Sequence, residues 1–337
     1  MSRFLSLALA TTLPLAAQTT SIIDRANQGS PTTPTPPHAS EQAPITPGAD
    51  TDAGIQRVAE PRRIPFRFSA SFDQQLYVAS NVFLTPDDNP GNDTGALVST
   101  TTLSVGLDTL PVVVGEGRLV FSVGFGWQRN LHGLATSDQA IEDLDFDSYF
   151  LPVTASYRWG RGWEARASVT FGSIYSIKDA PSHELIYRGL TPALSLRKIS
   201  RLSGHLVSAA GASISVSDTW ASRHDVPPVF SYRDDRNDRV DLSLDAALYA
   251  VDGPWTLSPS IRLVRSHYLH WQEGGFNSQD RDDLVASAGL VVSYSFADWG
   301  AARAFATYDL RESSGGIVDY DYGAGSAGFG LSLGIRF

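Results

Sequence analysis

The last ten residues of the chain, GFGLSLGIRF at positions 328–337, carry the pattern that decides the fold. Apolar side chains alternate there with small or charged ones along the whole stretch. The apolar set is Phe329, Leu331, Leu333, Ile335 and Phe337. A period of two is typical of a β-strand whose two faces meet unlike environments. We therefore expect a strand with one apolar face, ending on an aromatic side chain.

The same alternation continues through most of residues 64–337. It defines about twelve segments, at residues 66–78, 97–108, 118–128, 148–158, 163–175, 186–197, 205–216, 240–249, 255–263, 284–296, 303–311 and 328–337. Short connections such as 159–162 alternate with long polar ones such as 220–238. An even strand count with short turns on one side and long loops on the other is typical of transmembrane barrels. The sequence thus predicts an all-β fold, a transmembrane antiparallel up-and-down β-barrel.

This pattern resembles bacterial outer-membrane β-barrel proteins of the porin-like kind. In that family the C-terminal aromatic and the alternating hydrophobes before it form the signal read by the barrel-insertion machinery. The resemblance implies an assembly signal made of Phe329, Leu331, Leu333, Ile335 and Phe337. It also implies periplasmic chaperones and the barrel-assembly machinery as partners during insertion. Outer-membrane lipids and lipopolysaccharide are the expected surroundings.

Composition excludes several other classes of protein. The chain has 337 residues and no cysteine, so we expect no disulfide framework and no thiolate metal site. A formal net charge of −10 argues against a nucleic-acid partner. Mean hydropathy is −0.11 and gives no sign of a spanning helix, but alternating strands average to neutral values in any case. We predict no metal site and no cofactor.

The N-terminal part divides into two segments of different composition. Residues 1–17 combine a basic start, a short apolar run and small residues, which predicts a cleaved signal peptide. Residues 18–63 are rich in proline and polar residues, which predicts a disordered periplasmic linker ahead of a barrel at 64–337. A plug that enters the barrel and a tether to peptidoglycan are the alternatives for the linker. The linker is too short to be the passenger of an autotransporter, a class of protein whose translocator domain also has twelve strands.

Tryptophan positions favour a membrane over a soluble barrel. All seven fall at strand ends, near the short turns or toward the long loops. They are Trp127, Trp159, Trp163, Trp220, Trp255, Trp271 and Trp299. Amphipathic rings prefer the two membrane–water interfaces, so we expect two aromatic girdles.

Charged residues lie on the polar face of the predicted strands and form the candidate lumen. The arginines are Arg67, Arg118, Arg158, Arg166, Arg197, Arg262, Arg303 and Arg336. The acids are Asp73, Asp108, Glu164, Asp241, Asp245 and Asp309. Lumen side chains tune selectivity, so one interpretation is a lining that favours anions. The other interpretation is internal salt bridging that fills and rigidifies a closed barrel.

Acidic residues also gather in the predicted outer loops, where we expect a solvated surface. Asp147, Asp282 and Asp283 are assigned to these loop regions. Barrel enzymes need a placed nucleophile and base. His267 and Ser266 are adjacent near the outer rim, but alternation sends His267 to the lipid side and Ser266 to the other. We therefore predict no catalytic residues.

The sequence therefore predicts a passive outer-membrane channel for small hydrophilic solutes with a weak preference for anions. A closed barrel that acts as an envelope scaffold, or binds partners through its loops, is the alternative. A phospholipase-like barrel enzyme is a third, weaker hypothesis.

Overall fold

The computed structural model describes residues 66–82, 95–135, 139–142, 144–177, 185–222, 237–270, 281–315 and 321–336. The predicted signal peptide and linker, Trp271 and Phe337 lie outside these residues. Among the described residues, no helix is long and apolar enough to cross a membrane.

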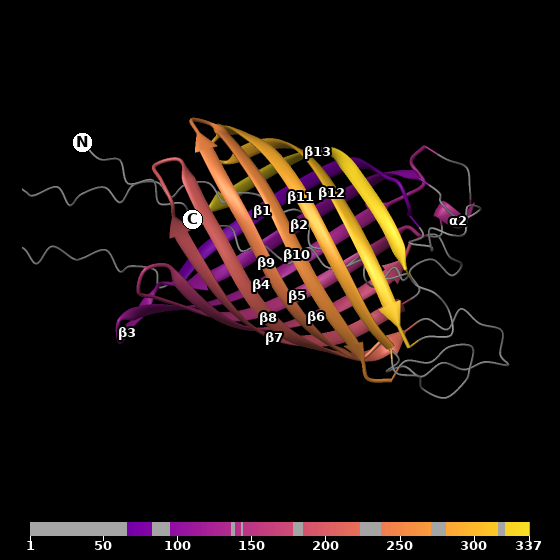
Figure 1. Cartoon of the computed structure of the whole chain (residues 1–337), viewed down its shortest axis with the longest axis horizontal. Helices are drawn as coiled ribbons and strands as arrows, with labels where there is room; N and C mark the ends of the chain where they lie inside the picture. The colour runs from indigo at the N-terminus through magenta and orange to yellow at the C-terminus, as the bar shows by residue number, and fades with distance from the viewer. Residues whose placement is uncertain are drawn as a thin grey trace, which may run out of the picture.

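Twelve long strands and one short strand make up a single sheet in the described part of the chain. They are β1 (Phe66–Ala79), β2 (Ala96–Thr109), the short β3 (Val112–Val114), β4 (Gly117–Leu131), β5 (Phe146–Trp159), β6 (Trp163–Ser176), β7 (Leu185–Arg201), β8 (Leu206–Ser222), β9 (Arg239–Asp252), β10 (Trp255–Tyr268), β11 (Arg281–Ala297), β12 (Gly300–Ser314) and β13 (Tyr322–Arg336). All neighbours are antiparallel. β1 pairs with β13, and β2 pairs with β4, so the sheet closes into the predicted barrel (Figure 1).

The two rims of the barrel differ in their connections. Phe66 pairs with Thr109, and Ser69 pairs with Arg336, so the start of β1 and the ends of β2 and β13 share one rim. The short turns lie on that rim, and Gly160 and Gly253 adopt the positive φ angles that two of these turns require. The strand ends that the longer connections join lie at the opposite rim, together with the helix α2 (Gln139–Glu142) (Figure 1). We name these the short-turn rim and the long-loop rim.

The outer wall of the barrel is apolar and exposed. Apolar side chains point outward at alternate positions on every long strand, and Ile261 is 64% and Phe329 72% exposed. An apolar surface of this extent is not stable in water and indicates a membrane environment. Aromatic pairs gather at the short-turn rim, with Trp159 stacked on Trp163 at 6.4 Å and Trp255 4.8 Å from Tyr294. The protein is therefore a transmembrane β-barrel of the outer-membrane type.

Three local expectations are wrong. β3 lies between the predicted strands 97–108 and 118–128, where the sequence predicts no strand, and it pairs with the start of β4. Asp147 lies in β5, and Asp282 and Asp283 lie in β11, because the strands run past their apolar centres into polar ends. Alternation within the predicted segment 186–197 puts Ile186 on the same outer face as Leu190. It is instead 5% exposed and packs with Phe146, because the β6–β7 register shifts beside it.

Candidate functional site

The inner wall of the barrel carries the fourteen charged residues predicted for the lumen. They lie on the face opposite the exposed apolar side chains, and the strand register aligns many of them in one cross-strand row. From β5 to β12 this row reads Arg158, Glu164, Arg197, Gly211, Asp245, Arg262, Ser287 and Asp309. Positive and negative side chains therefore alternate around the wall. The row joins residues far apart in sequence, so only the register reveals it.

Two ion pairs on this wall reach across an intervening strand at a glycine. Arg197 on β7 meets Asp245 on β9 at 3.4 Å, and Gly211 on β8 lies between them. A Cβ atom at Gly211 would lie 3.0 Å from Asp245 Oδ1. The missing side chain leaves the space in which this ion pair forms.

The second such ion pair spans the seam where the first and last strands meet. Arg303 on β12 donates from Nη1 and Nη2 to the two carboxylate oxygens of Asp73 on β1, both at 2.7 Å. Gly330 on β13 lies between them, and its Cβ would sit 3.0 Å from Arg303 Cζ. Ser332 also donates to Asp73. Nearer the short-turn rim, Arg336 on β13 donates to Asp108 on β2 at 2.8 Å. The Arg303–Asp73 pair therefore crosses β13, and the Arg336–Asp108 pair crosses β1.

Glu164 pairs with two arginines at the short-turn end of the wall. Its carboxylate accepts from Arg158 at 2.5 Å and from Arg166 at 2.8 Å. The side chain of Arg158 is 57% exposed and that of Asp245 is 37% exposed, so solvent reaches this half of the interior. Within the described residues, Arg67, Arg118 and Arg262 are the predicted lumen arginines that form no ion pair.

The long-loop end of the wall holds a charged cluster that the sequence reading missed. Arg281 donates from Nε and Nη2 to the two oxygens of Asp283, both at 3.0 Å, and Arg311 pairs with Asp283 at 2.5 Å. The Arg281 guanidinium lies 4.6 Å from the ring centre of Tyr268. We name Arg281, Asp283 and Arg311 the outer cluster. Its side chains are at most 1% exposed. Arg281 and Asp283 precede the predicted strand 284–296, and their alternation with Leu284 is the sequence signal that indicates a strand there.

The β4–β5 connection also covers part of the inner wall at this end. Ile141 of α2 packs with Ala79, Ala96 and Val98, all on the inward face of β1 and β2. Val98 is fully buried. The helix is therefore held against the inside of the long-loop mouth by apolar contacts. Both α2 and the outer cluster therefore lie on the inner side of the barrel at that end.

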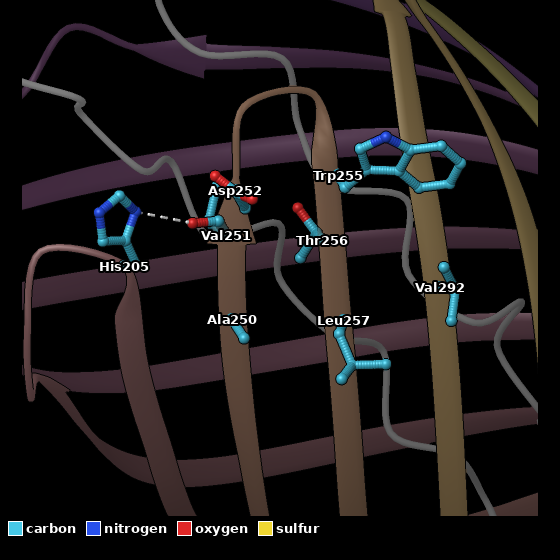
Figure 2. A pocket seen from close by; sticks show the side chains of 8 residues that line it. All are labelled: His205, Ala250, Val251, Asp252, Trp255, Thr256, Leu257 and Val292. Carbon is cyan, nitrogen blue, oxygen red and sulfur yellow. Dashed lines mark hydrogen bonds between the residues drawn. The ribbon is translucent and has the colours of Figure 1, made fainter.

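An apolar groove lies on the outer wall of the barrel near the short-turn rim, between β9, β10 and β11 (Figure 2). Leu257 and Val292 line it, and the ring of Trp255 stands beside them. His205, in the β7–β8 turn, lies at its edge with Nδ1 3.1 Å from the carbonyl oxygen of Val251. This hydrogen bond ties the β7–β8 turn to β9.

The histidine near the outer rim has an acidic partner, while the serine that precedes it in sequence lies on the opposite face of the sheet. His267 Nδ1 lies 3.2 Å from Asp282 Oδ1, and the His267 side chain is half exposed on the outer wall. Ser266 is buried on the other face of the same strand. The side chains of Ser266 and His267 thus point to opposite sides of the sheet, which does not fit a serine–histidine pair.

Comparison with known proteins gives distant structural likeness only. No family model matches the sequence, and no curated protein matches it. An outer membrane channel from Pseudomonas putida is 12% identical, with a TM-score of 0.47, over 86% of this chain and 100% of that one. The β domain of the Bordetella autotransporter BrkA is 16% identical, with a TM-score of 0.43, over 80% and 99%. The NanC porin is 10% identical, with a TM-score of 0.41, over 78% and 98%.

Proposed function

We propose that this protein is a passive outer-membrane channel for small hydrophilic solutes with a weak preference for anions. The observation that carries the proposal is the row of charged residues on the inner wall, whose side chains reach solvent in the short-turn half. A barrel filled for rigidity alone has no need of exposed charges at one end. Twelve strands are intermediate between small barrels filled by side chains and wide porins.

The anion preference follows from the balance of inner-wall charges. The predicted lumen set holds eight arginines and six acids, a surplus of two positive charges. Three arginines of this set have no ion-pair partner among the described residues: Arg67, Arg118 and Arg262. Among the six acids of the set, only Asp309 has none there. Unpaired arginines present donors to a passing anion.

Planar-bilayer recording of the refolded protein tests this function. We expect stepwise conductance, and a reversal potential in a potassium chloride gradient that indicates a moderate preference for chloride. The triple variant Arg67→Gln, Arg118→Gln, Arg262→Gln should lose that preference, while the exposed rim variant Arg201→Gln should keep it. A folded barrel without conductance would refute the channel, and a preference for cations would refute the role of the arginines.

The closed scaffold is the second candidate, and the outer cluster favours it. Arg281, Asp283 and Arg311 are fully buried at the long-loop end, where a wide pore would need free space. In that case the refolded protein forms a stable barrel that conducts no ions. An enzyme is a weaker candidate: lipase turnover lost on His267→Ala would revive it.

Targeting and assembly remain part of the proposal. We infer that residues 1–17 direct export and that residues 18–63 stay in the periplasm, because β1 begins at the rim with the short turns. Phe329, Leu331 and Ile335 are exposed on the outer wall and suit the proposed assembly signal. Periplasmic chaperones, lipopolysaccharide and the insertion machinery are the proposed partners.

A further inference from the structure

A pocket of about 320 Å³ lies at the short-turn rim, beneath the turn that joins β5 to β6. Arg118, Arg158, Glu116 and Glu164 line it together with Trp159 and Trp163. Its residues come from both faces of the wall, since the arginines belong to the inner face and the tryptophans to the outer one. The pocket therefore sits where the lumen, the periplasm and the membrane interface meet.

The pocket holds one arginine, Arg118, that has no ion-pair partner among the described residues. Arg118 and Arg158 are directly opposite each other on β4 and β5, and like charges in that position are destabilising. Glu164 does not resolve the conflict, because its two oxygens already accept from Arg158 and Arg166. Glu116 also lines the pocket, yet it forms no ion pair with either arginine among the described residues. Arg118 forms no ion pair there at all.

The donors that remain free suit an oxyanion. A guanidinium offers five N–H donors in a planar fork, and Arg158 uses its Nε for Glu164. An anion with several oxygens, placed between the two arginines, would accept from both and remove their mutual repulsion. Trp159 and Trp163 stack with their ring planes 17° apart and add an apolar wall. Lys198 lies 4.9 Å from the Trp163 ring centre and adds positive charge at the membrane interface.

We propose that this rim pocket binds a phosphate group between the guanidinium groups of Arg118 and Arg158. The group comes either from the headgroup of an anionic inner-leaflet lipid or from free phosphate in the periplasm. The site lies at the rim, and its occupancy does not depend on conduction through the barrel. We therefore expect a barrel that conducts no ions to bind the phosphate group at this site as well.

Two binding measurements on the refolded full chain test the site and identify the source. Inorganic phosphate is titrated against tryptophan fluorescence, and lipid retention is measured by native mass spectrometry from micelles with phosphatidylglycerol or phosphatidylcholine. Arg118→Gln should raise the half-saturating concentration roughly tenfold, the effect of losing one charge-assisted contact. Arg201→Gln, which removes an exposed arginine at the same rim outside the pocket, should change nothing. Glu116→Gln should tighten binding, because it removes the opposing carboxylate.

Each result of the two binding measurements either supports the site and identifies the source of the phosphate group or overturns the proposal. Retention of phosphatidylglycerol over phosphatidylcholine that is lost in Arg118→Gln supports the site with a lipid as its source. Saturable binding of inorganic phosphate alone, lost in the same variant, supports it with a soluble source. Absence of both, or equal binding by wild type and Arg118→Gln in a folded barrel, overturns the proposal.

Discussion

Glycine residues on the inner wall determine which charged side chains can meet. Arg303 reaches Asp73 over Gly330, and Arg197 reaches Asp245 over Gly211. In a strand, glycine is usually unfavourable because it adds no packing and costs backbone entropy. Here the missing Cβ provides the space through which an arginine crosses a whole strand. The alternation of glycine with leucine in residues 328–337 therefore serves the lumen as well as the lipid face.

Substitution of Gly330 tests this role. Gly330→Val should destabilise the barrel by about 1–3 kcal/mol, because the added methyl groups overpack the site and displace the Arg303 guanidinium. Gly334→Val is the matched control on the same face of β13, where a Cβ meets its nearest atom at an ordinary 3.8 Å. Urea unfolding in detergent micelles measures both variants. Equal stability of the two would show that the glycine is not needed for the ion pair.

At the scale of elements, the seam between β1 and β13 depends on side chains as well as on backbone pairing. Arg303 and Asp73 are buried, and their ion pair joins β12 to β1 across β13. Arg336 and Asp108 join β13 to β2 nearer the rim, where both side chains are more exposed. The two bridges differ in burial, so we expect them to differ in energy.

Substitution of one partner in each ion pair measures how much the buried pair and the exposed pair contribute to the free energy of unfolding. Asp73→Asn should cost about 3–5 kcal/mol of unfolding free energy, because it leaves Arg303 buried without a counter-charge. Asp108→Asn should cost about 0–1 kcal/mol, as is usual for exposed pairs. Equilibrium unfolding measures both, and the double variant Asp73→Leu, Arg303→Met should recover most of the first loss. Similar costs for the two single variants would contradict this assignment.

The α2 connection is the second element whose role can be measured. Ile141 anchors the helix to the inward face of β1 and β2. Ile141→Asp should release it, because a carboxylate is costly in an apolar cluster, and the single-channel conductance should rise. Leu134→Asp, an exposed position in the same connection, is the control. Unchanged conductance in Ile141→Asp would mean that α2 does not narrow the mouth.

For the molecule as a whole, sequence alternation predicts much of the architecture. The twelve long strands, the closed barrel and the apolar outer wall follow from period-two patterns, since each strand carries its own signal. The outer cluster was not predicted, because Arg281 and Asp283 sit in a polar strand end that reads as loop. The charge row through Glu164, Arg197 and Asp245 was not predicted either, because register depends on pairing between distant strands.

A charged thiol reagent applied to single-cysteine variants during bilayer recording is the most direct test of a conducting lumen. The chain has no native cysteine, so each variant reports one position. Ser260 faces the inner wall beside Arg262, and its neighbour Ile261 faces outward. A positively charged methanethiosulfonate should reduce the current through Ser260→Cys in discrete steps and leave Ile261→Cys unchanged. No current in either variant, or equal block of both, would contradict the account.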